Sequence, residues 1–135
     1  LIDLSIHSKN GHVALSSIAE RNGIPPQYLE QVFAGLRRYG IIKSIKGAQG
    51  GYLLNDDAKN ITAASIIEAL EGTYRIEEEI NKGEEESSVA ERVIQNTIID
   101  QVNKQLDKVF LNISLADLEN DYLEYNIYAE HMYYI

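Results

Sequence analysis

The chain has 135 residues, a length that suits one domain or one domain with an arm. Its formal net charge is −9 and it contains no Cys. These residues therefore cannot form a disulfide, a zinc–thiolate site or a cysteine-bound iron–sulfur cluster. No apolar run approaches the roughly 18 residues of a membrane span. The first residues lack the basic segment and cleavage site of a signal peptide, so we expect a cytoplasmic protein.

The negative charge is unevenly distributed. Residues 1–62 hold seven basic and five acidic side chains, for a net charge of +2, whereas residues 63–135 hold five and sixteen, for −11. Four of the basic residues fall within ten positions that contain no acid: Arg37, Arg38, Lys43 and Lys46. The overall charge argues against a nucleic-acid partner, but the basic cluster in the first half is compatible with one.

The first half is predicted to form three short helices and a hairpin. Turn signals and helix caps place the helices at residues 1–8, 17–21 and 25–39. Ser17 and Glu20 have the spacing of a capping box at the start of the second helix. The hairpin is predicted from a strand, a glycine-rich turn and a return strand, at 41–45, 47–51 and 52–54. This order of elements is typical of a winged helix-turn-helix.

The third predicted helix has two distinct faces. An apolar stripe with helical spacing is expected to face the core: Leu29, Val32, Phe33 and Leu36. The polar stripe on its other side contains Gln27, Glu30, Gln31, Ala34 and Arg38. Gln and Glu side chains can read base edges in a major groove. An ordinary solvated helix face has the same pattern, so the stripe alone does not decide between the two.

The second half is predicted to be helical and acidic. Thr62 is expected to cap a helix over 63–70. We therefore divide the chain into a head over 1–72, an acidic loop over 73–87, and an arm with a tyrosine-rich tail over 88–135. Within the arm, a long helix is predicted over 88–112 and a short one over 114–118, capped by Ser114. The fold class is therefore mainly α with one small β-hairpin.

The long helix of the arm has an apolar stripe that needs a partner. The stripe consists of Ala90, Ile94, Ile98, Val102, Leu106 and Val109. At ~1.5 Å per residue the helix would be ~35 Å long, which favours a dimer interface over an intramolecular core. The predicted dimer interface consists of Ile94, Ile98, Val102, Leu106 and Val109.

One set of motifs extends over most of the chain. It comprises GIPPQYLEQ at 23–31, Leu36-Arg37, Gly40-Ile41, KSIKG at 43–47, GGYLL at 50–54 and SLADL at 114–118. This set resembles the Rrf family of bacterial winged-helix transcription regulators. The resemblance implies a DNA-binding head and a dimerisation arm. The family's first helix usually begins upstream of the position of Leu1, so we expect the chain to lack the start of that helix.

The absence of Cys separates this chain from part of that family. Cluster-binding members carry cysteine ligands in the segment that corresponds to 73–88, where this chain has none. The ending HMYYI at 131–135 is similar to that of the cluster-free cysteine-metabolism repressors (CymR-like). In that subgroup the signal comes from a cysteine-biosynthesis enzyme or from small-molecule effectors, and the resemblance implies such partners here. His7, His12 and His131 lack ligand spacing, so neither a metal nor a cofactor is expected.

The residues expected to contact DNA lie on the third helix and on the hairpin, which forms the wing. Lys residues that flank the wing can neutralise phosphates or enter the minor groove, and its glycines can take positive φ and approach DNA closely. Tyr28 can donate to a phosphate. The candidate DNA-binding residues are Pro26, Gln27, Tyr28, Glu30, Gln31, Arg37, Arg38, Lys43, Lys46, Gly47, Gly50 and Gly51.

The sequence thus predicts a homodimeric transcription repressor that binds a palindromic operator without an iron–sulfur cluster. No catalytic constellation is present, so an enzyme is not expected, and no membrane partner is expected. Two alternatives stay open at this point. One is a protein-interaction module built on the winged-helix scaffold, and the other is a small-molecule sensor whose site lies in the tyrosine-rich tail.

Overall fold

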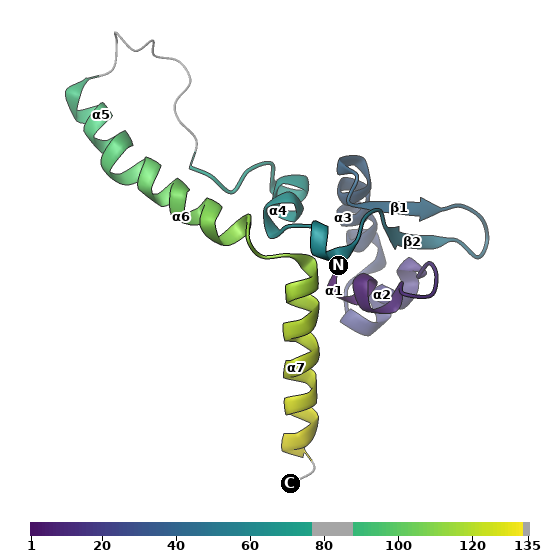
Figure 1. Cartoon of the computed structure of the whole chain (residues 1–135). Coiled ribbons are helices and arrows are strands. Elements are labelled where there is room, and N and C mark those ends of the chain that lie inside the picture. Colours follow the sequence, from purple (N-terminus) through teal and green to yellow (C-terminus); the bar gives the residue numbers. More distant parts are fainter. Residues whose placement is uncertain (77–87, 134–135) are drawn as a thin grey trace.

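The computed structural model describes residues 1–76 and 88–133, which form a head and two long helical projections (Figure 1). The head contains α1 (Ile2–His7), α2 (Leu15–Asn22), α3 (Pro26–Tyr39), β1 (Ile42–Ile45), β2 (Gly51–Leu54), the 3₁₀ turn η1 (Ala58–Asn60) and α4 (Ala63–Glu71). The projections contain α5 (Val89–Ile94), the π-turn η2 (Gln95–Ile99), α6 (Asp100–Phe110) and α7 (Leu115–Tyr133).

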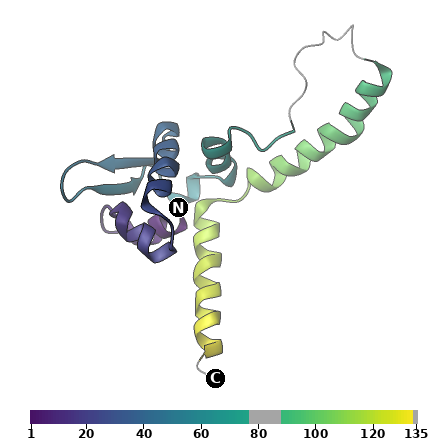
Figure 2. The ribbon, with the colours of Figure 1, turned by 180° about the vertical axis from the view of Figure 1, so that it is seen from behind.

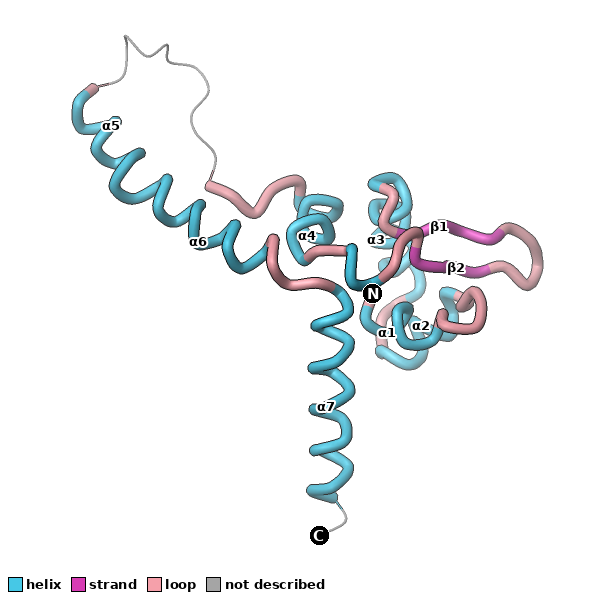
Figure 3. The backbone as a smooth tube through the Cα atoms, viewed as in Figure 1, coloured by secondary structure: helices cyan, strands magenta, loops and turns pink. Residues whose placement is uncertain are grey.

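The head has the predicted winged helix-turn-helix fold. In Figure 3 the β1–β2 hairpin, in magenta, stands out among the described helices and loops. The two strands are antiparallel, with Ile42 opposite Leu54 and Ile45 opposite Gly51. The hairpin projects to one side of the head, whereas the rod formed by α5 and α6 projects to the other, and both views agree on this (Figures 1 and 2). The wing and the arm therefore offer surfaces that do not obstruct each other.

The core of the head is built around one face of α3. Leu29, Phe33 and Leu36 are buried as predicted, and Val32 is half-buried at the edge. The ring of Phe33 meets the ring of Tyr52 edge-on, with 4.9 Å between their centroids. This contact packs the wing against α3 at the point where β2 leaves the tip. The apolar period of α3 therefore determines how the wing is attached to it.

The second helix begins earlier than the sequence predicts. α2 starts at Leu15, and its N-cap is Ala14, which has an extended backbone and no capping side chain. Ser17 already lies in the first turn, where its N–H donates to the carbonyl of Ala14. The predicted capping box at Ser17 was wrong because Val13 forms an antiparallel β-bridge with Tyr52, and the chain enters the helix directly from that bridge.

The predicted short helix after residue 114 is in fact a helix of 19 residues. Ser114 and Asp117 form the expected cap, with each side chain bonded to the other's backbone N–H. α7 then continues through Leu118 to Tyr133. The predicted end at 118 was wrong, because no Gly or Pro follows to stop the helix.

The first turn of α7 belongs to the core of the head. Leu115 is 0% exposed and packs with Leu4 and Ile61 in the buried cluster. The backbone N–H of Leu115 donates to Ile61 (2.7 Å), and that of Ala63 donates to Ile113 (2.8 Å). These bonds form a short antiparallel bridge that ties the start of α7 to the start of α4. The predicted division at residue 72 did not include this contribution to the head.

A buried carboxylate strengthens the same attachment. Glu119 accepts a hydrogen bond from the hydroxyl of Ser5 in α1, and its other oxygen lies 3.1 Å from the ammonium of Lys9. Burial by itself raises the pKa of Glu119, but the bonds from Ser5 and Lys9 together outweigh it, and the pKa lies below its ordinary value. The charged carboxylate of Glu119 therefore attaches α7 to Ser5 in α1 and to Lys9, which follows α1.

The long helix predicted over 88–112 is one rod that contains a π-turn. Ser88 and Glu91 cap it reciprocally. Apolar residues spaced by four drift by ~40° per step around an α-helix with ~3.6 residues per turn. The π-turn η2, with its i→i+5 bonds, takes up one extra residue and removes ~100° of that drift. The stripe from Ala90 to Leu106 therefore stays on one side of the rod.

Residues 77–87, which include most of the predicted acidic loop, lie outside the described part of the chain. Within residues 1–76 and 88–133, none of the helices has both the length and the apolar character that crossing a membrane requires.

The attachment of α7 can be tested by truncating one side chain. We expect Leu115→Ala to lower the free energy of unfolding by about 2–5 kcal/mol, because it opens a cavity in the core. Leu70→Ala is the matched control, since Leu70 is 43% exposed and its truncation should cost about 0.5 kcal/mol or less. Urea denaturation measures both. Equal losses would contradict the placement of Leu115 in the core of the head.

Candidate nucleic-acid interface

The exposed side of α3 carries the predicted polar stripe. Pro26, Gln27, Glu30 and Gln31 are exposed, and Ala34 is half-buried behind them. The helix begins with two prolines, whose fixed φ favours the first turn. It ends at Gly40, which has φ +90°. These two signals set the length of α3, and its apolar face turns the polar stripe toward solvent.

One flank of α3 faces the wing. The guanidinium of Arg37 donates to the hydroxyl of Ser44 in β1, across 3.4 Å. Because side chains alternate along a strand, Lys43 and Ile45 point to the other side of the hairpin from Ser44. The structure therefore brings Arg37 to the wing but does not bring Lys43 to the same face. Ser44 was absent from the sequence prediction, since nothing local marks a Ser on a strand as a partner of a distant Arg.

The other flank of α3 faces the end of α4. A groove lies between them, lined by Tyr28, Gln31, Val32, Gly35, Arg38, Ala69, Leu70 and Glu71. The hydroxyl of Tyr39 donates to Glu68 across 2.9 Å, and this bond raises the pKa of Tyr39. Tyr28, Gln31 and Arg38 thus border α4, whereas Arg37 contacts the wing. By helical spacing, Pro26 and Glu30 lie on the same side of α3 as Arg37. The predicted DNA-contacting side chains of α3 therefore form two groups around the helix axis, with Gln27 between them.

An isolated β-bridge extends the wing beside β2. Val13 pairs with Tyr52 through two backbone hydrogen bonds, 3.0 and 2.8 Å long. The ring nitrogen Nε2 of His12 lies 2.6 Å from the carbonyl oxygen of Gln49 near the wing tip. His12 lacks the spacing of a metal ligand, and nothing else near it in the sequence indicates a role. Its position beside the wing depends on a contact with a residue far along the chain.

Two of the wing glycines are required by the protein's own backbone. A Cβ on Gly51 would overlap the carbonyl group of Val13, and one on Gly50 would overlap the carbonyl oxygen of Ile45. Among the three wing glycines, only Gly47 has a positive φ, at +120°. The expectation that all three glycines take positive φ was therefore wrong for Gly50 and Gly51, which permit close approach between strands.

Six of the seven basic side chains in residues 1–62 fall into two groups. Arg21 binds the carboxylate of Asp3 through two hydrogen bonds, 2.7 and 2.9 Å long, and this pairing lowers the pKa of Asp3. Lys9 pairs with Glu119. Within residues 1–76 and 88–133, the four cations of the basic cluster make no ion pair and are exposed: Arg37, Arg38, Lys43 and Lys46. The charge available to an anionic partner is thus concentrated on α3 and the wing.

The predicted dimer stripe lies along the rod of α5 and α6. Ile94, Ile98, Val102 and Val109 are exposed, and Leu106 is half-buried. Exposed apolar side chains are common singly, but a contiguous stripe is typical of an interaction surface.

A family model described as "Rrf2: Iron-dependent Transcriptional regulator" matches residues 1–121. The chain belongs to the Rrf2 family. The resemblance found in the sequence is thereby confirmed.

Named relatives of this Rrf2 chain are regulators of transcription. IscR of Yersinia enterocolitica is 34% identical over 121 residues, which cover 90% of this chain and 73% of IscR. The structure of CymR, the global cysteine regulator of B. subtilis, has a TM-score of 0.67 at 36% identity, covering 88% of this chain and 86% of CymR. IscR of T. potens has a TM-score of 0.66 at 38% identity, covering 89% and 77%. The Rrf2 chain is therefore a DNA-binding transcription regulator and not an enzyme.

The family description includes iron, but the residues of this Rrf2 chain do not fit an iron or cluster site. The sequence contains no Cys. In the part of the chain that the structure describes, no three His, Asp or Glu side chains gather into a metal-binding group.

The close approach at the wing predicts opposite outcomes for one substitution at two glycines. Gly51→Ala should lower the free energy of unfolding by about 1–3 kcal/mol, because the new methyl group has no room beside Val13. Gly35→Ala is the control, since its Cβ would sit 3.6 Å from the nearest atom, and a helical Ala should stabilise by about 0.5–1 kcal/mol. Thermal unfolding measures both, and a tolerated Gly51→Ala would refute the packing of the wing.

Proposed function

We propose that this Rrf2 protein is a repressor that binds a palindromic operator as a homodimer and carries no iron–sulfur cluster. The observation that carries the proposal is the separation of two surfaces. The exposed basic cluster lies on α3 and the wing, while the exposed apolar stripe lies on a rod that projects away from the wing (Figure 2). One surface suits an anionic polymer, and the other suits a second apolar surface.

In this proposal α3 enters the major groove. Gln27 and Gln31 can pair with adenine, and Glu30 can accept from cytosine. Arg37 and Lys46 contact phosphates next to the groove, and the wing reaches toward the adjacent minor groove. Arg37 is supported for this role by its bond to Ser44, which holds the guanidinium between α3 and the wing.

The apolar stripe of the arm supports the proposed homodimer. Two rods related by a two-fold axis bury the stripes of Ile94, Ile98, Val102, Leu106 and Val109 against each other. Such a dimer presents two copies of α3 to two half-sites, the usual arrangement of helix-turn-helix proteins. The head carries a net charge of only +2 over residues 1–62. One head alone therefore binds DNA weakly, and repression depends on both heads binding together.

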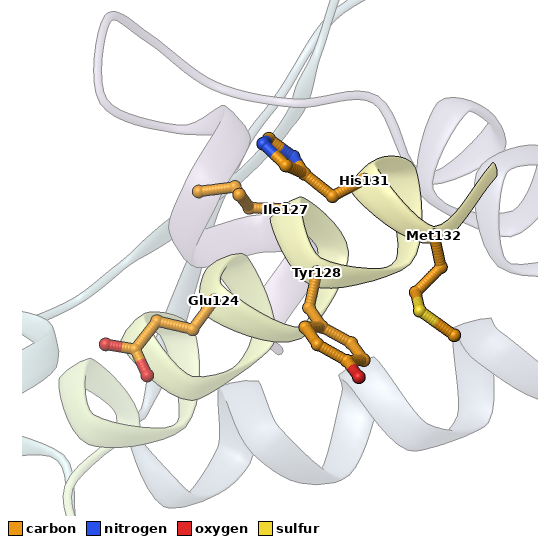
Figure 4. Close-up of a pocket in the computed structure, with 5 residues that line it drawn as sticks. All are labelled: Glu124, Ile127, Tyr128, His131 and Met132. Atoms are coloured by element: carbon orange, nitrogen blue, oxygen red, sulfur yellow. The ribbon is translucent and has the colours of Figure 1, made fainter. Parts of the chain in front are cut away.

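The exposed helix α7 gives less support to the small-molecule sensor. A hollow near its end is lined by Glu124, Ile127, Tyr128, His131 and Met132, all from this one helix. Figure 4 shows Ile127 and His131 on one side of the helix and Tyr128 and Met132 on another. A surface made by one helix does not enclose a small molecule. Kinship with the cysteine regulator CymR instead favours a search for the effector among cysteine-biosynthesis enzymes and cytoplasmic metabolites.

DNA binding can be tested by selecting duplexes from a random pool and measuring affinity against salt. We expect affinity to fall steeply with salt, and Lys46→Ala to weaken binding by about tenfold and reduce the salt slope by about one. Lys59→Ala is the matched control, because Lys59 is exposed on η1, which packs against α7. Failure to select any duplex at low salt would refute the proposal and favour a protein-interaction module.

The double variant Gln31→Ala with Lys46→Ala tests whether the head recognises a specific DNA sequence or has lost that role. We expect it to lose most of its preference for the selected operator over random duplex, since one base contact and one phosphate contact are removed together. Unchanged operator binding would contradict the assignment of the contacts.

The dimer can be tested with a charge placed in the stripe. Ile98, which is 53% exposed in the single chain, becomes buried in the proposed interface. Ile98→Glu should weaken dimerisation by about 100-fold or more, because an unpaired buried carboxylate costs several kcal/mol. Asn96→Glu adds the same charge two residues away, on a different side of the helix. Analytical ultracentrifugation distinguishes them, and a dimeric Ile98→Glu protein would rule out this interface.

A further inference from the structure

The segment that leaves the head after α4 is bound to the side of α6. The hydroxyl of Tyr74 donates to Oδ1 of Asp107 across 2.7 Å. The guanidinium of Arg75 donates to Oδ2 of the same carboxylate across 2.9 Å. The ring of Tyr74 also packs on the ring of Phe110, with 4.9 Å between centroids. One carboxylate on the arm thus holds two consecutive residues of the head's exit segment.

Asn103 holds the next residue by its backbone. The N–H of Ile76 donates to Oδ1 of Asn103 (2.8 Å), and Nδ2 of Asn103 donates to the carbonyl of Ile76 (3.0 Å). Asn103 is only 5% exposed, although it lies on a rod whose other faces are largely open to solvent. A side-chain amide that pairs with both the N–H and the C=O of one residue sets the direction of the backbone at that residue, because both bonds must be straight at once. We call the contacts of residues 74–76 with Asn103, Asp107 and Phe110 the clamp.

The clamp lies beside the dimer stripe without using it. Asn103, Asp107 and Phe110 are spaced i, i+4 and i+7, which puts them on one side of α6. Val102 and Val109 are each one residue earlier, on the neighbouring side, and remain exposed. The same helix can therefore bind the head and a second rod together.

The rod is fixed to the head at two separate points. The first is its end, where the bridge between Thr62 and Ser114 follows α6. The second is the clamp, which reaches Asn103, about 10 Å further along the helix from Phe110 at ~1.5 Å per residue. A rod held only at its end can pivot, whereas a second attachment along its length sets its direction.

We infer that Asn103 and Asp107 are positioning residues for operator recognition: by binding residues 74–76 they set the angle between head and arm, and so the spacing of the two half-sites that a dimer accepts. The inference rests on the proposed homodimer. From Phe110 to Val89 the rod is ~30 Å long at ~1.5 Å per residue. A tilt of ~10° moves its far end by ~5 Å, which is more than the ~3.4 Å between base pairs. Loosening the clamp should therefore broaden the accepted spacing by one or two base pairs.

The test uses full-length protein and the operator selected by the wild type. Duplexes are made with the spacer between half-sites unchanged, shortened or lengthened by one or two base pairs, together with a duplex that holds a single half-site. Binding is measured by fluorescence anisotropy. We expect the wild type to prefer one spacing by about tenfold or more, and Asn103→Ala to lose most of this preference. Its affinity for the single half-site should stay within about twofold of wild type, since α3 and the wing are untouched.

Two further variants separate positioning from general damage. Tyr74→Phe removes the bond to Asp107 but keeps the ring on Phe110, so it should broaden the spacing preference less than Asn103→Ala. Lys104→Ala alters an exposed neighbour of Asn103 and should keep the wild-type preference. Within residues 1–76 and 88–133, the side chain of Lys104 makes no hydrogen bond or ion pair.

The outcomes are distinguishable. A wild-type spacing preference retained by Asn103→Ala overturns the inference and leaves the homodimer standing. An equal loss of affinity for every duplex, the single half-site included, assigns Asn103 a purely structural role and also overturns it. A wild-type protein that binds without any spacing preference overturns the homodimer and this inference with it.

Discussion

The insertion of Leu115 into the head is the contact on which the rest of the molecule depends. Because this residue lies at the first turn of α7, its burial brings the end of the rod and the start of the last helix to the same point of the head. The bridge to Ile61 and Ala63 and the buried carboxylate of Glu119 then satisfy the polar groups that this insertion removes from water. Both projections extend from this junction.

The ion pairs of the head determine where its positive charge is available to a partner. Counted along the sequence, the head is only weakly basic. In the fold, Arg21 and Lys9 are neutralised by Asp3 and Glu119 on the side of α1, so they add little to the field at the interface. The remaining positive charge of the basic cluster lies on α3 and the wing. An acidic protein thereby keeps a local surface that suits DNA.

Local patterns were sufficient to predict the main elements and much of the candidate site. The spacing of Leu29, Phe33 and Leu36 identified the buried face of α3, and so its exposed side, since both follow from 3.6 residues per turn. The start of α2 was mispredicted because Val13 forms a β-bridge with Tyr52, a residue far along the chain. Which side chains of α3 face the wing and which face α4 also depends on contacts between residues far apart in the sequence.

The sequence by itself determined the winged-helix order of elements, the Rrf2 family and the lack of cysteine ligands, because motifs, turn signals and composition are local properties. Only the tertiary structure decided that Leu115 is part of the head, that Gly50 and Gly51 serve the packing of the wing, and that residues 74–76 bind α6. Each of these joins residues that are distant in sequence. Their contacts arise from how the elements pack, which spacing along the chain does not encode.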